Sequence, residues 1–92
     1  MKIENWERQD VNKHKIIWKH DTGVTIMLNP ADRYAYKLVL YDKQGREHFR
    51  IFNPNKTKLE QESVKWQRDY NRYLKKNKKP KEEPVYMNGR ME

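Results

Sequence analysis

Apolar residues recur at every second position through much of the first half of the chain. Segments 14–20 and 24–28 both show this alternation, and residues 21–23 between them (Asp-Thr-Gly) have turn chemistry. Such a pattern is typical of two strands that each bury one face. We therefore predict an antiparallel hairpin in which Trp18 faces Ile26 and the large apolar residues gather on one side.

A second hairpin is predicted further along the chain. Residues 34–41 form the longest candidate strand, residues 42–45 (Asp-Lys-Gln-Gly) form a turn, and residues 46–52 return. In the register that this turn favours, Lys37 lies directly opposite Arg50 on a basic face, while the other face is apolar. Like charges across a pair destabilise a sheet unless an anionic partner covers them.

The second half of the chain predicts one helix. Residues 57–60 (Thr-Lys-Leu-Glu) match a capping box, in which the first and last side chains satisfy free backbone NH groups at a helix start. A stripe of apolar residues follows at helical spacing, and we expect it to pack on the sheet. Its members are Leu59, Trp66, Tyr70, Tyr73 and Leu74. The helix is expected to end before Pro80.

Together these elements predict a single domain of the α+β class. Its sheet is a meander of three or four antiparallel strands, and one C-terminal amphipathic helix covers the apolar face. We assign residues 13–77 to this domain. Residues 1–12 are an N-terminal segment that either adds an edge strand or packs over the core, and residues 78–92 are expected to form a flexible charged tail.

Composition narrows the compartment and the partners. The 92-residue chain has no cysteine, which excludes disulfides and thiolate metal sites and favours a reducing compartment, so we expect a cytoplasmic protein. No apolar stretch approaches the ~18 residues of a membrane span, and we expect no signal peptide. A net charge of +8 favours a polyanionic partner, because Lys and Arg that neutralise phosphates release condensed counterions.

Two basic regions are candidate nucleic-acid sites. The first is the polar face of the predicted sheet, with Lys15, Lys19, Lys37, Tyr41, Arg46, His48 and Arg50. The second is the basic end of the helix and the residues after it, namely Arg72, Lys75, Lys76, Lys78 and Lys79. A solvated surface explains the first region equally well, and the helix macrodipole favours cations at the second. Tyr41 and Phe52 are also candidate platforms for base stacking.

The sequence lacks the residue patterns of catalysis and of cofactor or metal binding. His14 and His20 would lie about 20 Å apart along one strand, too far to share an ion, and His48 has no ligand spacing to either. There is no nucleophile elbow and no glycine-rich phosphate loop. We therefore expect a protein that is not an enzyme and that uses no cofactor.

Residues 36–46, residues 50–52 and a helix from Thr57 resemble the small sheet-plus-helix DNA-binding domains of plant AP2 proteins and of integrase arm-binding domains. Those domains insert a three-stranded sheet into the major groove. The resemblance covers about residues 24–76 and leaves out the strand at 14–20. It implies that the groove-facing positions are Lys37, Arg46, His48 and Arg50.

A separate likeness is carried by two short segments. Residues 5–8 and 18–23 resemble a pattern in short archaeal proteins, which implies no activity. From charge and the sheet face, we expect a nucleic-acid-binding protein that prefers duplex DNA to RNA or single strands. The alternative is a protein-binding module, for example of a virus or mobile element, that acts on a host factor.

Overall fold

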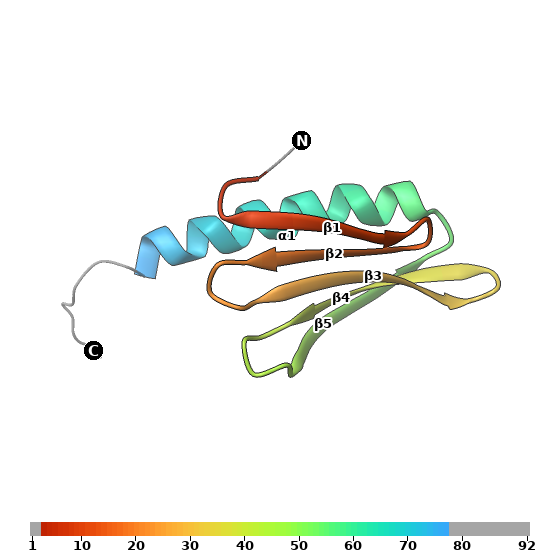
Figure 1. Ribbon diagram of the computed structural model, residues 1–92, viewed down its shortest axis with the longest axis horizontal. Helices are drawn as coiled ribbons and strands as arrows, with labels where there is room; N and C mark the ends of the chain where they lie inside the picture. The colour runs from red at the N-terminus through yellow and green to blue at the C-terminus, as the bar shows by residue number, and fades with distance from the viewer. Residues whose placement is uncertain (1–2, 78–92) are drawn as a thin grey trace.

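The computed structural model describes residues 3–77, which form an antiparallel sheet and one helix (Figure 1). The chain order is β1 (Trp6–Asn12), β2 (Lys15–His20), β3 (Thr25–Asp32), β4 (Ala35–Tyr41), β5 (Glu47–Asn53) and α1 (Lys56–Asn77). The strands pair in sequence order as a meander. The helix packs on one face of the sheet (Figure 1), so the α+β class is confirmed.

The described sheet has five strands, and the predicted number of three or four is wrong. The additional strand is β1, which pairs with β2 from Trp6 opposite His20 to Gln9 opposite Ile17. Trp6 is buried, but the other six residues of β1 are exposed. An edge strand with only one buried side chain shows little alternation, which is why the pattern left this segment open. The predicted tail, 78–92, lies outside the described residues.

The first hairpin has the predicted register. Ile16 lies opposite Leu28 and Trp18 lies opposite Ile26. The turn is closed by a bond of 2.9 Å from the amide of Gly23 to the oxygen of His20. Gly23 has a φ of 101°, which favours a residue without a Cβ atom, so the turn sets the register.

The second hairpin has a different register from the predicted one. Lys37 lies opposite Phe52 and not opposite Arg50, and the partner of Arg50 is Val39. The pairing has slipped by two residues along β5, and an irregularity between Leu40 and Tyr41 adjusts the ladder near the turn. A shift of two positions preserves the alternation of side chains, so Lys37 and Arg50 still share a face without forming a directly opposed pair.

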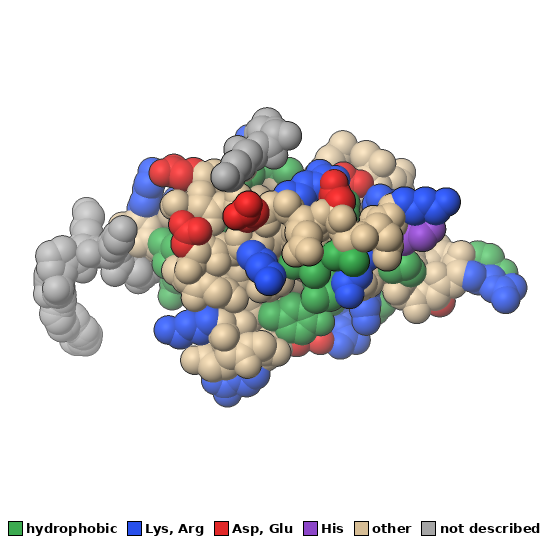
Figure 2. All heavy atoms as spheres, viewed as in Figure 1, with side chains coloured by type: hydrophobic (Ala, Val, Ile, Leu, Met, Phe, Trp, Pro, Cys, Tyr) green, Lys and Arg blue, Asp and Glu red, His purple; other side chains and the backbone are tan. Residues whose placement is uncertain are grey.

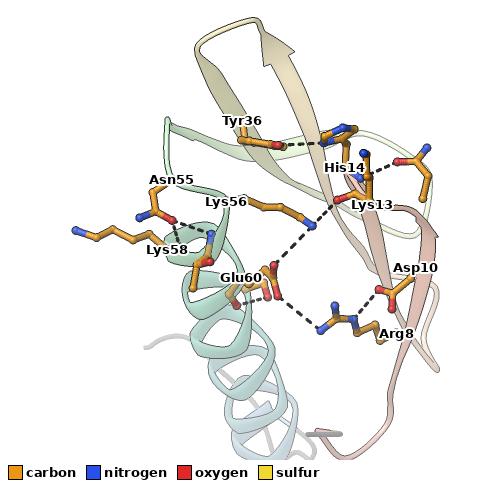
Figure 3. Close-up of polar contacts among 12 residues, drawn as sticks. Arg8, Asp10, Lys13, His14, Tyr36, Asn55, Lys56, Lys58 and Glu60 are labelled. Atoms are coloured by element: carbon orange, nitrogen blue, oxygen red, sulfur yellow. Dashed lines mark hydrogen bonds and ion pairs between the residues drawn. The ribbon is translucent and has the colours of Figure 1, made fainter.

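The helix begins at Lys56, and the predicted capping box at Thr57 is wrong. The Oδ1 atom of Asn55 accepts hydrogen bonds from the amides of Thr57 (2.9 Å) and Lys58 (3.3 Å), so Asn55 is the N-cap (Figure 3). Glu60 lies 3.9 Å from the Lys56 ammonium and 3.8 Å from the Arg8 guanidinium. The ion pair with Arg8 ties the first turn of α1 to β1.

The buried line of the helix is more polar than predicted. Leu59, Ser63 and Gln67 are almost fully enclosed, whereas Trp66 is only partly buried and Tyr73 is 58% exposed. Ser63 is satisfied by a bond of 2.6 Å from its hydroxyl to the oxygen of Glu60. The core between sheet and helix therefore consists mainly of strand residues.

Candidate functional site

The sheet face that points away from α1 has an apolar centre. Ile17, Met27 and Val39 lie side by side across β2, β3 and β4 and belong to this face by alternation. Val39 is only 1% exposed, although it is not part of the core cluster between the sheet and the helix. Its neighbours on the same face therefore enclose it, and this surface, called the open face below, differs from an ordinary solvated sheet face.

Three lysines surround the apolar centre of the open face. Lys15, Lys19 and Lys37 alternate with buried residues of β2 and β4, so their side chains project from this face. Within residues 3–77, neither Lys15 nor Lys19 forms an ion pair. Lys37 acts electrostatically on Glu47 and helps to lower the pKa of that carboxyl. Positive charge on the open face is therefore only partly compensated.

Two aromatic side chains share the open face with these lysines. Phe52 is 55% exposed and lies opposite Lys37. Tyr41 is partly buried and lies opposite Thr25 of β3. These are the two residues that the sequence indicated as stacking platforms, and the structure places both on the surface that carries the lysines.

Arg50 also belongs to the open face, but it has an acidic partner. Its guanidinium donates bonds of 2.7 Å and 2.6 Å to the two carboxylate oxygens of Glu47. This bidentate contact lowers the pKa of Glu47 and raises the pKa of Arg50. The charge of Arg50 is thus largely neutralised by its own strand.

Arg46 and His48 gather at the β4–β5 turn and not over the centre of the open face. Both lie near Asp42, with His48 Nε2 2.9 Å and Arg46 Nε 3.7 Å from Asp42 Oδ2. The backbone amide of Arg46 also donates to Asp42 Oδ1 at 2.9 Å. That bond and the bond with His48 lower the pKa of Asp42. The contacts of both residues with Asp42 therefore order the turn.

The predicted helix-end site does not join the open face. Arg72, Lys75 and Lys76 are exposed on α1, which packs on the opposite side of the sheet. Arg72 is bonded to Asp69 at 3.0 Å. Lys78 and Lys79 lie outside the described residues. The predicted nucleic-acid residues thus divide into the open face, the β4–β5 turn and the helix end.

Charged residues of both signs are mixed over the visible surface. Figure 2 shows lysine and arginine side chains among aspartate and glutamate side chains, with apolar groups between them. No uniform basic surface appears in this view. The important difference is therefore which cations form ion pairs. Arg50 is bonded to Glu47, whereas Lys15 and Lys19 form no ion pair within residues 3–77.

An apolar cleft lies between the β5 edge and the second half of α1. It has a volume of about 470 Å³, and its walls include Leu40, Phe49, Ile51, Trp66 and Tyr70. The rings of Phe49 and Trp66 are 6.3 Å apart, yet Phe49 is 62% exposed. The sequence did not indicate this cleft, because the predicted register, with Lys37 opposite Arg50, puts Phe49 opposite Leu38 on the apolar face, whereas Phe49 lies opposite Leu40.

The histidines are engaged in separate local contacts. His14 Nδ1 lies 3.1 Å from the Tyr36 hydroxyl, and buried His20 contacts Thr22 and Asn71 through its two ring nitrogens. Among residues 3–77 no group of three or more potential metal ligands occurs. In the same part of the chain, no helix is long and apolar enough to cross a membrane.

Comparison of the chain with models of known protein families, with curated proteins and with solved structures gives no match.

Proposed function

We propose that the protein binds nucleic acid through the open face of its sheet. The observation that supports this best is the placement of Lys15, Lys19 and Lys37 around an apolar centre. Neither Lys15 nor Lys19 forms an ion pair within the described residues, although Glu7 of β1 lies opposite Lys19. The net charge of +8 adds long-range attraction for a polyanion. Arg46 and His48 are not part of this proposal, since Asp42 holds both.

Phosphate contacts are the physical basis of the proposed affinity. Each phosphate that a lysine neutralises releases condensed counterions, so affinity falls steeply as salt concentration rises. Lysines without ion pairs are suited to this role, because no internal contact has to be broken before they reach a phosphate. The open face thus offers charge for the backbone of a nucleic acid and an apolar area for its bases.

Binding of a labelled oligonucleotide, titrated at several salt concentrations, tests this proposal. Replacing Lys19 and Lys37 together by glutamine should reduce the steepness of the salt dependence by about 1.4 to 1.8, as expected for two lost phosphate contacts. Replacing Lys58 and Lys65 together by glutamine is the matched control, because both are exposed on α1. Equal losses from the two double variants would mean that overall charge, and not the open face, determines binding.

The apolar cleft favours a second candidate function, the binding of an extended peptide from a protein partner. β5 is an edge strand of the described sheet, so its free edge can accept a further strand, and the cleft beside it can take an apolar side chain. Peptides selected by display should lose binding in Phe49→Ser and keep it in Phe52→Ala. Selected peptides that bind both variants equally would exclude the cleft as their site.

A further inference from the structure

We infer that the nucleic acid bound by the open face is single-stranded, an inference that rests on the proposed function. Its basis is the combination of the exposed Phe52 ring, the partly buried Tyr41 ring, lysines and an apolar centre on one surface. Bases of a single strand have free faces that can stack on protein rings, whereas bases in a duplex are already stacked on each other.

The width of the sheet argues against groove binding by this face. Five strands span four spacings of about 4.8 Å, or roughly 19 Å, whereas the major groove is only about 12 Å wide. A groove of that width admits a helix, a two-stranded ribbon or the three-stranded sheet of the domains named above, but not five strands side by side. A five-stranded face is broad enough for an extended strand to lie across it, and for this reason a single strand is inferred in place of the duplex expected from the sequence.

The aromatic residues and lysines are arranged along a possible path for such a strand. Phe52 lies opposite Lys37, and Tyr41 is four residues from Lys37 along β4, about 13 Å at the usual strand rise. Lys19 lies opposite Thr25, which lies opposite Tyr41, so this second ring also has a lysine in its row. Each ring can stack on a base while a lysine in the same row reaches a phosphate.

The apolar centre lies between these two rows. Ile17, Met27 and Val39 lie opposite one another across β2, β3 and β4. Along β4, Val39 lies between Lys37, which is opposite Phe52, and Tyr41. Covering an apolar surface with a base is favourable, because it removes that surface from water, whereas a charged phosphate provides no such stabilisation. A ligand that presents only its sugar-phosphate backbone, as a duplex does outside its grooves, would leave this centre without a partner.

Phe49 provides a matched control for the stacking role of Phe52. Both residues lie on β5 and are similarly exposed, 62% for Phe49 and 55% for Phe52. They lie on opposite faces, because Phe49 lines the cleft beside α1 while Phe52 pairs with Lys37 on the open face. A general effect of removing an exposed ring should therefore appear in both variants. A loss of stacking on the open face should appear only in the Phe52 variant.

The experiment compares a labelled single strand of deoxythymidines, a single strand of uridines and a duplex of the same length by fluorescence anisotropy at several salt concentrations. The single strands should bind at least about tenfold more tightly than the duplex. Phe52→Ala should weaken single-strand binding on the order of 5- to 150-fold without changing the salt dependence, and Phe52→Tyr should restore it. Phe49→Ala should bind as the parent does.

The outcomes separate this inference from the proposed function. Duplex binding equal to or tighter than single-strand binding overturns the inference and leaves the proposed function standing. Equal losses from Phe49→Ala and Phe52→Ala also overturn the inference, since stacking on the open face would then play no part. Absence of saturable binding to all three probes at low salt overturns the proposed function together with the inference.

Discussion

The indole nitrogen of Trp6 donates a hydrogen bond of 3.2 Å to the main-chain oxygen of Gln67, across 61 positions of sequence. The same nitrogen lies 3.1 Å from Oδ1 of Asn71, whose side-chain nitrogen donates to the oxygen of Glu4 at 2.8 Å. His20 Nε2 also contacts Asn71 Oδ1, at 3.2 Å. This network joins the first strand, the end of β2 and the helix, and it makes the N-terminal strand part of the core.

Trp6→Phe should therefore lower the free energy of unfolding by about 1–3 kcal/mol, because it removes the buried hydrogen bond to Gln67 and leaves part of the space of the buried indole empty. Trp66→Phe is the matched control. The Trp66 indole donates a hydrogen bond of 3.0 Å to Glu62, one turn away on the same helix, and is only partly buried. Trp66→Phe should therefore lower the free energy of unfolding less than Trp6→Phe does. Urea denaturation followed by far-ultraviolet circular dichroism measures both. A greater loss from Trp66→Phe would contradict the assigned network.

The N-cap assignment gives a second prediction. Asn55→Ala should destabilise the protein by about 0.5–2 kcal/mol, because the Asn55 side chain accepts hydrogen bonds from two free amides of the first turn. Thr57→Ala should have little effect, since Thr57 lies within the helix and is exposed. Thermal denaturation of the two variants distinguishes the observed cap from the capping box expected at Thr57. A larger loss of stability from Thr57→Ala than from Asn55→Ala would contradict the Asn55 cap and support the capping box.

The β4–β5 turn should make stability depend on pH in the acidic range. Hydrogen bonds from Arg46 and His48 lower the pKa of Asp42 below 3.8. A carboxyl whose pKa is lower in the folded state contributes stability above its unfolded pKa and loses that contribution as the pH falls through the folded pKa. The stability difference between the parent and Asp42→Asn should therefore be largest above about pH 4 and should shrink below it. Chemical denaturation across this range measures the difference, and a constant difference would show that the charge of Asp42 plays no part.

The success of sequence prediction depended on how each turn sets its register. In the first hairpin, a short turn with Gly23 at positive φ fixes Trp18 opposite Ile26, as the alternation predicts. In the second hairpin, Gly45 has a positive φ as well, but the irregularity between Leu40 and Tyr41 shifts the ladder, and alternation determines only which face a side chain occupies. The slip by two residues leaves Lys37 on its predicted face but replaces its partner Arg50 by Phe52, and alternation cannot distinguish these two registers.

The buried face of the helix and the candidate site also depend on contacts between distant parts of the sequence, which local patterns do not specify. Helical spacing places Trp66 in the buried stripe, but the indole of Trp6 from β1 bonds to the helix at Gln67, and Trp66 is only partly buried. A helix next to that indole buries Ser63, a small residue, without a clash. The cleft beside Phe49 could not be predicted either, because it depends on this helix position and on the register of β5.

The last prediction concerns Glu47, whose carboxylate holds the guanidinium of Arg50 on the open face. Glu47→Gln should release Arg50, and the affinity for a single strand should then rise on the order of 3- to 10-fold at 50 mM salt, with a salt dependence steeper by about 0.7. Damage to the fold could not produce such a gain, since misfolding lowers affinity.

Asp69→Asn is the matched control for this gain. It removes the same charge and releases Arg72, which Asp69 holds at 3.0 Å on the helix, away from the open face. If nucleic acid lies on the open face, Glu47→Gln should strengthen binding more than Asp69→Asn does. A larger gain from Asp69→Asn would place the ligand at the helix end with Lys75 and Lys76, and equal gains would mean that net charge alone sets the affinity.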